Sequence, residues 1–490
     1  MALLRYSEEQ VLDRLRFENP WWVTGTVEDY YNSMQRRLYF DLFMPLVTET
    51  GVRRAVVLMG PRRVGKTVMM YHAVQNLLES EIDPLKVAFI SVETPIYNSI
   101  SLEQLFSFCR KATKQGNPKG WYIFFDEIQY LKDWEVHLKS LVDSYPHTRF
   151  VASGSAAAAL RLKSNESGAG RFTDFMLPPL TFNEFLHLKQ LNRLITETNM
   201  EWHGSLTKFY GTNNINELNK HFLDYINYGG YPEVIFSEKI QSNPGRYIRS
   251  DIIDKVLLRD LPSLYGIRDV QELNSLFTAI AYNSAGEVSL EELSKNSGVQ
   301  KNTIKRYIEY LEAAFLIRVV HKISNKPKQF QRATQFKVYL TNPSLRSALF
   351  APLQPTDPFV GNMVETAIYA QWLHRGWFTP YYARWQKGEV DMVKLDDKNF
   401  KPLWAVEIKW TNQFYEKPGD LKPLLRFLRD NNLQTALITT IDKEGTKEID
   451  DLKLKFIPAS VYAYTVGKNT ILQSKTEPMR AVRQPPASRR

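Results

Sequence analysis

Apolar runs of strand length mark the first part of the chain. They lie at Ala55–Met59, Val87–Val92, Trp121–Phe125 and Arg149–Ser153, with helical stretches between them. Nearly continuous apolar strands are typical of a parallel sheet that is covered on both faces. The pattern therefore predicts an α/β domain over residues 51–190, preceded by a helical lead-in over residues 1–50.

The periodicity changes after this domain. From about residue 185 to 270, amphipathic helical stretches alternate with loops and there is no strong strand signal, which predicts a helical lid or connector over residues 191–270. From about residue 357 the order becomes helix, strand, strand, helix, strand. This order predicts a separate C-terminal α/β domain over residues 346–468, with a helix near residues 419–431 and a strand at Thr435–Thr439. The Pro-rich, basic tail at residues 469–490 is expected to be disordered.

A helix-turn-helix pattern occupies residues 289–320, inside a segment (271–345) that we interpret as winged-helix-like. The first helix carries Leu290 and Leu293, Gly298 and Val299 form the turn, and the inner face of the second helix is lined by Ile304, Ile308 and Leu311. Its outer face offers Gln300, Lys301, Asn302, Lys305 and Arg306, and the runs Leu316–Val320 and Phe336–Leu340 would supply a wing. The segment either reads nucleic acid or serves as a rigid lid or protein contact, and the pattern leaves both open.

The strongest chemical signal is a G-x-x-x-x-G-K-T motif between the first apolar strand and a helix. Glycines in such a loop let backbone N–H groups and the helix N-terminus face a phosphate, while the lysine reaches the β- and γ-phosphates and the threonine hydroxyl holds Mg²⁺. The motif predicts that the chain binds ATP with Mg²⁺. The predicted phosphate-binding residues are Gly60, Pro61, Arg62, Arg63, Val64, Gly65, Lys66, Thr67 and Val68.

Two acids follow the third apolar strand, about 60 residues downstream of this loop. The carboxyl ends of parallel strands share one edge, so Asp126 would hold the Mg²⁺ water shell and Glu127 would polarise the attacking water. Ser153, at the end of the next strand, would contact the γ-phosphate or that water. Together these residues predict ATP hydrolysis.

A second set of ionisable residues lies near the C-terminus. Glu407 and Lys409 alternate along one predicted strand and so share a face, and Asp391 lies mid-strand in the preceding run. The connection Leu395–Leu403 is short enough for a hairpin, and Glu365 lies on the preceding helix. We predict that the three carboxylates converge on Mg²⁺, with Lys409 positioning the nucleophile or balancing charge. The alternative for such a pair is a solvated salt bridge.

Composition narrows the class of protein. A chain of 490 residues predicts two or three domains, and its hydrophobic share of 43% is that of a soluble globular protein. No run of 18 apolar residues and no signal pattern is present, so we expect no membrane span or secretion signal. The single cysteine, Cys109, excludes an internal disulfide and a cysteine-rich zinc site, which favours a reducing cytoplasm.

Charge is unevenly distributed along the chain. The net charge is +10, and the stretch from Ala313 to Thr356 contains no Asp or Glu. A local positive field attracts phosphate backbones, so this stretch suggests contact with nucleic acid. A solvated face, or a surface that docks on an acidic part of the same chain, would explain it equally well. Its basic residues are Arg318, Lys322, Lys326, Lys328, Arg332, Lys337 and Arg346.

These motifs together resemble those of prokaryotic AAA-superfamily ATPases related to the signal-transducing STAND group. The resemblance is carried by GPRRVGKT, FFDEIQYL, VASGS, Gly170-Arg171, PLTFNEFL and YGGYPE, in the expected order. It implies that Arg171 senses or stabilises the γ-phosphate, either in its own subunit or across an interface. Val68 stands where many relatives have a second threonine. The resemblance leaves the oligomeric state and any protein partner open.

The C-terminal residues resemble the restriction-endonuclease-like fold with its Asp…Glu-x-Lys signature. They also resemble the C-terminal domain of unknown function that commonly follows this ATPase type. Asp391, Glu407 and Lys409 match the core motif, and Glu365 matches the acid of the preceding helix. The resemblance implies a Mg²⁺-dependent, nuclease-like domain that acts on nucleic acid, most simply DNA.

Three hypotheses follow from the sequence. In the first, ATP drives a switch coupled to the nuclease-like centre, in defence against foreign DNA or in mobile-element maintenance, a setting that rests on resemblance alone. In the second, the ATPase is a timer for an adaptor that binds DNA or a partner protein without cutting. The third, a motor that translocates on DNA, is the weakest because no helicase motif set is present.

Overall fold

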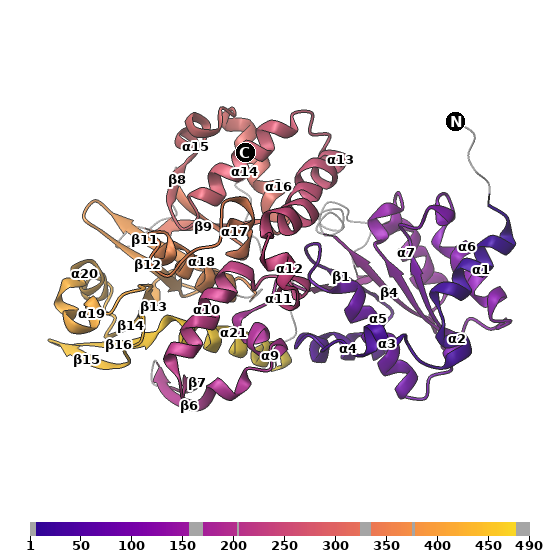
Figure 1. The fold of residues 1–490 in the computed structure, drawn as a ribbon, viewed down its shortest axis with the longest axis horizontal. Coiled ribbons are helices and arrows are strands. Elements are labelled where there is room, and N and C mark those ends of the chain that lie inside the picture. Colours follow the sequence, from indigo (N-terminus) through magenta and orange to yellow (C-terminus); the bar gives the residue numbers. More distant parts are fainter. Residues whose placement is uncertain (1–5, 156–169, 203–204, 324–334, 375–377, 477–490) are drawn as a thin grey trace. The chain divides into compact units, whose positions relative to one another are not determined.

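The structure is a computed structural model that describes residues 6–155, 170–202, 205–323, 335–374 and 378–476 (Figure 1). The chain divides into two compact units, an N-terminal unit (Met1–Pro178) and a C-terminal unit (Pro179–Arg490). Each unit has its own β-sheet and is described here by itself.

The N-terminal unit is built on a five-stranded sheet in the order β2-β3-β4-β1-β5, in which every pairing is parallel. Figure 1 shows helices on both sides of this sheet. The strands are β1 (Ala55–Met59), β2 (Val87–Ser91), β3 (Tyr122–Asp126), β4 (Arg149–Gly154) and β5 (Phe172–Met176). The prediction of a parallel α/β sheet is confirmed, and the four predicted strands agree with β1 to β4 to within one residue at each end.

Helices surround these strands and connect them. Those of the N-terminal unit are α1 (Glu8–Glu18), α2 (Trp21–Thr24), α3 (Asp29–Asn32), α4 (Phe40–Thr48), α5 (Lys66–Glu79), α6 (Leu102–Ala112) and α7 (Trp134–Ser144). Short 3₁₀ turns lie at η1 (Pro84–Lys86), η2 (Pro95–Tyr97) and η3 (Ile128–Tyr130).

The helical lead-in covers the edge strand β2. The fully buried Asn19 side chain donates from Nδ2 to the backbone oxygen of Phe89 at 2.9 Å and accepts from the Phe89 N–H at 2.6 Å. Trp21 and Trp22 each donate from Nε1 to the backbone oxygen of Val87 at 2.8 Å. These side chains satisfy backbone groups that an edge strand otherwise leaves open.

The C-terminal unit contains a nine-stranded mixed sheet in the order β15-β16-β14-β13-β12-β11-β9-β10-β8. Its strands are β8 (Glu287–Ser289), β9 (Ile317–Ile323), β10 (Gln335–Leu340), β11 (Tyr381–Trp385), β12 (Gly388–Leu395), β13 (Pro402–Glu407), β14 (Thr435–Thr440), β15 (Gly445–Ile449) and β16 (Leu452–Pro458). The parallel pair β9–β11 joins the two halves, so segments 271–345 and 346–468 share one hydrogen-bonded sheet.

Helices cover both faces of this sheet. One face contributes Met392, Val406 and Leu437 to a core with α9, α10, α18 and α21, and the other contributes Val390 and Ile438 to a core with α20. The helices are α9 (Phe182–Leu188), α10 (Ile215–Tyr228), α11 (Pro232–Phe236), α12 (Glu238–Gln241), α13 (Leu261–Tyr265), α14 (Val270–Tyr282), α15 (Leu290–Ser297), α16 (Lys301–Ala313), α17 (Ser344–Leu349), α18 (Val360–Trp372), α19 (Gln413–Glu416), α20 (Lys422–Asp430) and α21 (Ala459–Thr476). Two π-helices, η6 (Gly245–Asp254) and η7 (Val256–Asp260), and two 3₁₀ turns, η5 (Asn192–Leu194) and η8 (Pro418–Asp420), complete the unit.

The predicted helix-turn-helix elements are present. Helix α15 ends at Gly298, whose φ of 76° lets the chain turn at low steric cost, and α16 buries Ile304, Ile308 and Leu311. The antiparallel pair β9–β10 corresponds to the two predicted wing runs. In the C-terminal part, helix α20 and strand β14 occur where they were predicted.

The prediction of a helical connector without a strong strand over residues 191–270 is wrong for its first part, while helices follow from residue 215 onward. Strands β6 (Ile195–Trp202) and β7 (Ser205–Thr212) form an antiparallel hairpin there. The C-terminal helix supports this hairpin, because the Tyr210 and Tyr464 rings lie 5.2 Å apart and Asn469 Nδ2 donates to the Lys208 oxygen at 2.9 Å. The supporting residues are more than 200 positions away, so the local pattern did not reveal the strands.

The predicted boundary of the basic tail also needs correction. Helix α21 continues to Thr476 because Val466, Thr470 and Ile471 are buried against the core, so the tail does not begin at residue 469. The remainder of the predicted tail, residues 477–490, lies outside the described residues. Among the helices that the structure describes, none combines the length and the apolar character needed to cross a bilayer.

The lead-in contact gives a first prediction. Asn19→Ala removes three hydrogen bonds to backbone groups and leaves buried N–H and C=O groups unpaired, which we expect to cost about 2 kcal/mol. The unfolding transition of the N-terminal unit should fall by about 4–8 °C. Differential scanning calorimetry measures the midpoint temperature of this transition. A ligand stabilises the unit that binds it, so the transition whose midpoint rises when ADP is added is assigned to the N-terminal unit.

The exposed Asn98 supplies the control. Asn98→Ala should leave this transition within about 2 °C of wild type, since surface substitutions of this kind change stability by at most about 0.5 kcal/mol. Equal transitions for Asn19→Ala and wild type would contradict the inferred role of the lead-in.

Candidate functional site

The predicted phosphate loop lies between β1 and α5, at the carboxyl edge of the parallel sheet. Gly65, with φ of 94°, precedes the first residue of α5, and Arg63 also has a positive φ of 65°. A Cβ on Gly60 would approach the backbone oxygen of Leu177 to 2.2 Å, so only glycine fits there. The buried Lys66 donates from Nζ to the backbone oxygens of Gly60 and Pro61 at 3.2 and 3.0 Å.

The structure brings the predicted magnesium residues together beside this loop. Thr67 Oγ1 donates to Asp126 Oδ2 at 2.8 Å, and Ser153 donates to the other oxygen of the same carboxylate. Burial, followed by the neighbouring Glu127 charge, raises the pKa of Asp126 to about 6. A hydroxyl and a carboxylate at this distance fit Mg²⁺, which prefers oxygen ligands and retains several waters.

Glu127 occupies a strained backbone position directly after β3. Its φ of 53° and ψ of 47° are left-handed, and its N–H donates to Ser153 Oγ at 3.1 Å. Gln129 donates from its side-chain amide to the Glu127 carboxylate and accepts from the Ser155 N–H at 3.2 Å. This chain of contacts fixes the orientation of the predicted water-polarising carboxylate. Sequence reasoning missed Gln129, although it stands within the same FFDEIQYL motif.

Sequence reasoning also missed Arg37, a residue of the lead-in that donates a hydrogen bond to the backbone of the phosphate loop. This buried side chain donates from Nη1 to the Val64 oxygen at 2.7 Å and from Nη2 to the Pro178 oxygen at 3.0 Å. Both acceptors are backbone groups distant in sequence, so no local pattern identifies the role.

Arg171 does not lie at the nucleotide site of its own subunit. It immediately precedes β5, and its backbone oxygen accepts from the Ala55 N–H at 2.9 Å, at the amino edge of the sheet. Its guanidinium pairs with Asp143 at 2.5 Å. The phosphate loop follows the opposite end of β1, so this position does not fit the first of the two alternatives, a role within the same subunit. A role across an interface between copies stays a prediction.

In the C-terminal unit, Asp391, Glu407 and Lys409 come together and are called here the acid–lysine centre. Lys409 Nζ lies 2.8 Å from Asp391 Oδ2 and 2.8 Å from Glu407 Oε1. The hairpin β12–β13 produces this contact, since Met392 pairs with Val406 and the neighbouring positions 391 and 407 therefore face each other. The predicted hairpin is present, whereas β13 ends at Glu407, so Lys409 lies two residues beyond the strand and meets Glu407 from there.

The two carboxyl groups of this centre have pKa values that are shifted in opposite directions. Burial, followed by the nearby Asp391 charge, raises the pKa of Glu407 to about 7. Burial acts in the same direction on Asp391, but Lys409, Lys337 and the Ile408 N–H outweigh it and lower the pKa of that carboxyl. Glu407 Oε2 is buried and has no hydrogen-bond partner in the described part of the chain. One carboxylate oxygen is therefore available for a cation.

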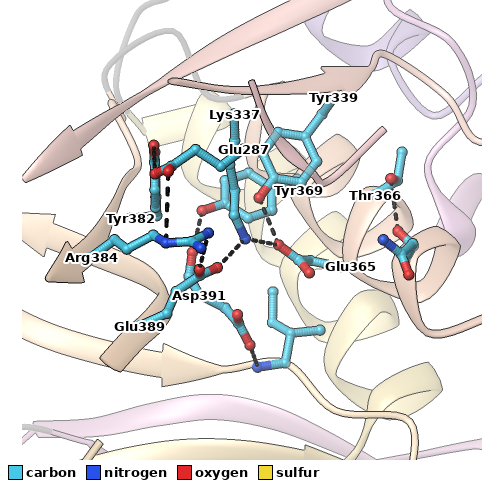
Figure 2. A network of polar contacts seen from close by, with 12 residues as sticks. Glu287, Lys337, Tyr339, Glu365, Thr366, Tyr369, Tyr382, Arg384, Glu389 and Asp391 are labelled. Atoms are coloured by element: carbon cyan, nitrogen blue, oxygen red, sulfur yellow. Dashed lines mark hydrogen bonds and ion pairs between the residues drawn. The ribbon is translucent and has the colours of Figure 1, made fainter. Parts of the chain in front are cut away.

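Glu365 does not join this centre as a third ligand. Its carboxylate accepts from Lys337 Nζ at 2.9 Å and from the Tyr339 hydroxyl at 2.7 Å, and Lys337 also pairs with Glu389 at 2.6 Å (Figure 2). Across the described ranges, no group of three or more His, Cys, Asp or Glu side chains is arranged to hold a metal ion. The predicted convergence of three acids on one metal is corrected, because a lysine already satisfies Glu365.

The basic stretch is less exposed than its sequence suggested. Lys337 and Arg346 are buried, and Lys322 lies 3.6 Å from Glu287. The Arg346 guanidinium lies over the rings of Phe350 and Phe359. These two buried residues do not form the surface that the nucleic-acid interpretation needs, and Lys337 instead fits the alternative of docking on an acidic part of the same chain. Three others, Lys326, Lys328 and Arg332, lie outside the described residues.

Comparisons with known proteins agree with the first site. Residues 52–186 match a family model described as an AAA domain, and residues 219–356 match a domain of unknown function (DUF8612). With the parallel sheet, the first match supports an α/β P-loop ATPase domain of the AAA type in the N-terminal unit. Neither model covers the acid–lysine centre.

Similar curated proteins carry no described function. An uncharacterized protein of Methanocaldococcus jannaschii is 23% identical over 403 residues, which cover 80% of this chain and 83% of the relative. An uncharacterized protein of Haemophilus influenzae is 24% identical over 409 residues, covering 82% and 92%. Among solved structures, the S. cerevisiae Hsp104-ADP complex shows 10% identity and a TM-score of 0.28, covering 57% of this chain and 38% of that chain. A TM-score this low supports no inference.

The Arg37 contacts give a second prediction. Arg37→Ala frees the Val64 carbonyl and loosens the loop, which should weaken ADP binding about tenfold, since hydrogen bonds from charged donors contribute roughly 1.5–3 kcal/mol. The neighbouring Arg36, half exposed and 3.8 Å from Glu79, supplies the matched control. Isothermal titration calorimetry should show Arg36→Ala close to wild type, and equal affinities for both variants would contradict the inferred role.

The Asp126 carboxyl gives a third prediction, on pH. Its pKa is raised to about 6, so the carboxylate that would hold Mg²⁺ is present above pH 6 and is lost as the pH falls through 6. The Mg²⁺-dependent part of nucleotide affinity should therefore decrease between pH 7 and pH 5. Titrations with ADP and saturating Mg²⁺ measure it.

Asp126→Asn separates this effect from protonation of the nucleotide itself, which is the same in both proteins. In Asp126→Asn the affinity for ADP should not contain the contribution that depends on the Asp126 carboxylate. The ratio of wild-type affinity to variant affinity should therefore shrink as the pH falls. A ratio that stays constant from pH 7 to pH 5 would show that Asp126 does not control the step.

Proposed function

We propose that this chain is an ATP-hydrolysing switch that controls a nuclease-like, nucleic-acid-acting centre in its C-terminal unit. The single observation that carries the second half of the proposal is the position of Lys409, 2.8 Å from both Asp391 and Glu407 on adjacent strands. The first half rests on the AAA domain match and on the contacts of Lys66, Thr67 and Asp126.

At the nucleotide site, each residue has a distinct role. Lys66 would exchange its backbone acceptors for the β- and γ-phosphates of ATP, and Thr67 and Asp126 would hold Mg²⁺ with its waters. Glu127, oriented by Gln129, would accept a proton from the attacking water. The bound Mg²⁺ supplies charge neutralisation on the phosphates.

At the acid–lysine centre, Asp391 and Glu407 would hold Mg²⁺ between them, and the unpartnered Glu407 Oε2 supports this role. The cation supplies Lewis acidity toward a phosphodiester. Lys409 is 28% exposed, so its ammonium group can turn from the two carboxylates toward a phosphate or an attacking water. The exposed outer face of α16, with Lys301, Lys305 and Arg306, offers a second contact for a nucleic-acid backbone.

The alternative function is an ATP-regulated adaptor that binds nucleic acid or a protein without cutting. The observation that favours it is the ion pair of Glu365 with Lys337, which removes one acid from the predicted metal set. The biological setting of defence or mobile-element maintenance rests on resemblance alone.

Incubation with supercoiled plasmid, single-stranded DNA and RNA, with Mg²⁺ or Mn²⁺ and with or without ATP, tests the proposal. We expect Asp391→Asn to reduce cleavage at least about 100-fold, the scale of losing one preorganised electrostatic contact. Lys66→Ala should reduce ATP hydrolysis by a similar factor and change the response of cleavage to ATP.

Asp397, on the turn of the same hairpin and 85% exposed, is the matched control, and Asp397→Asn should cleave like wild type. ATP hydrolysis that depends on Lys66, together with no cleavage of any substrate with either metal, would reject the nuclease and favour the adaptor.

A further inference from the structure

A second buried ammonium group reaches the carboxylates next to the acid–lysine centre. Lys337, on β10, has a side chain that is only 4% exposed, and its Nζ lies 2.9 Å from Glu365 and 2.6 Å from Glu389 (Figure 2). Glu365 belongs to α18 and Glu389 to β12, two positions before Asp391. One lysine thus joins two carboxylates from the predicted nuclease-like domain to a strand of the winged-helix-like segment.

The contact between Lys337 and Glu389 reaches across two intervening strands. Strands β9 and β11 lie between β10 and β12 in the sheet order, so flat strands would place β10 and β12 about 14 Å apart. The 2.6 Å contact between Lys337 and Glu389 therefore spans the two strands between them, and it places both side chains on the same face of the sheet. Lys337 is therefore an internal residue of the sheet and not a surface residue.

Other groups hold the two carboxylates in place. The Tyr339 hydroxyl donates to Glu365 at 2.7 Å, and Arg384 donates from Nη1 to Glu389 at 2.9 Å (Figure 2). Glu365 and Glu389 each have one ammonium partner and one further donor. Their charges are already compensated, and a divalent cation among them would meet the fixed positive charge of Lys337 at close range.

Lys337 remains charged in this position. Burial acts to lower its pKa, but the charges of Glu365, Asp391 and Glu389 outweigh burial and hold the pKa well above its ordinary value. Its side chain also lies over the Tyr382 ring, with Nζ 5.4 Å from the ring centre. The ammonium group therefore stays protonated near neutral pH, and its burial keeps it from turning toward solvent.

The charges of Asp391 and Glu407 also raise the pKa of Lys409, so both lysines remain charged, but Lys409 differs in its exposure and in its partners. Its side chain is 28% exposed, against 4% for Lys337, and one of its partners, Glu407, retains a buried oxygen without a hydrogen bond among the described residues. A cation that approaches Asp391 and Glu407 finds an available oxygen and a lysine that can turn to solvent. A cation that approaches Glu365 and Glu389 finds neither.

We infer that Lys337 is a fixed internal cation that takes the place of a second divalent metal. The centre therefore accepts one Mg²⁺ or Mn²⁺ on Asp391 and Glu407, and Glu365 is a partner of Lys337 rather than a metal ligand. The inference rests on the proposed function in that it assumes a cation at the acid–lysine centre. It assigns the winged-helix-like segment a direct electrostatic role in that centre, through β10.

Counting bound Mn²⁺ tests the inference without any need for cleavage. The full-length chain carries Asp126→Asn, so that no cation at the nucleotide site is counted, and is titrated with Mn²⁺ without nucleotide by electron paramagnetic resonance. We expect one bound Mn²⁺ per chain. Adding Lys337→Met should raise the number to two, since Glu365 and Glu389 lose their cation and become ligands.

Lys322→Met is the matched control, because Lys322 lies on the adjacent strand β9 and pairs with Glu287. This variant should still bind one Mn²⁺. Two Mn²⁺ in the parent chain, or one in a folded Lys337→Met variant, would overturn the inference.

Lys337→Met leaves buried carboxylates without a partner, so folding is checked by circular dichroism. Where that variant does not fold, Glu365→Gln decides the question. We expect Glu365→Gln to keep one Mn²⁺ with an affinity within threefold of the parent, whereas Asp391→Asn should lose it. A loss of more than tenfold in Glu365→Gln would make Glu365 a ligand and reject the inference.

The outcomes also separate this inference from the proposed function. No Mn²⁺ bound in the parent chain would overturn both the inference and the metal-dependent centre. One Mn²⁺ in the parent and two in Lys337→Met, with no cleavage of any nucleic acid, would support the inference and reject nuclease turnover alone.

Discussion

Burying a charged side chain costs free energy unless an opposite charge or a hydrogen-bond donor meets it. Both candidate sites of this chain follow from that constraint. In the N-terminal unit the buried Asp126 carboxylate is met by the hydroxyls of Thr67 and Ser153. In the C-terminal unit the carboxylates of Glu365, Glu389, Asp391 and Glu407 are met by two lysines. The neutral hydroxyls do not cancel the negative charge of Asp126, which can still attract a cation. The two lysines, in contrast, neutralise part of the negative charge of the four carboxylates in the C-terminal unit.

This difference separates the two sites chemically. A hydroxyl partner such as Thr67 can stay beside Asp126 when Mg²⁺ arrives, because both are oxygen ligands. An ammonium partner must move away, because it repels the metal. Lys409, partly exposed, can do so, while Lys337 is held between Glu365 and Glu389. The exposure of each lysine therefore determines which carboxylates remain open to metal.

The parts of the molecule that the sequence predicted are those encoded over a few neighbouring residues. The four strands β1 to β4, the phosphate loop and the β12–β13 hairpin follow from apolar runs, glycines and short connections. The parts that it did not predict depend on distant partners. Lys337 looked like one member of a basic stretch, because nothing near it in the sequence indicates that Glu365 and Glu389, from two other elements, will pair with it. Arg171 matched a motif by order alone, and only the register of β5 shows that it starts at the amino edge.

The shared sheet also bears on how the C-terminal unit could transmit a signal. Helix α16 leads into β9, β9 pairs with β10 and β11, and β11 pairs with β12, which carries Asp391. A partner that binds α16 would thus act on the acid–lysine centre through continuous backbone hydrogen bonds and through Lys337. The candidate nucleotide site lies in the other unit, so ATP could act on this centre only if two nucleotide states favour different conformations of the chain. The ion pairs of Lys337 make large rearrangements within the centre costly, which favours control through access of nucleic acid to a preformed site over assembly of the site itself.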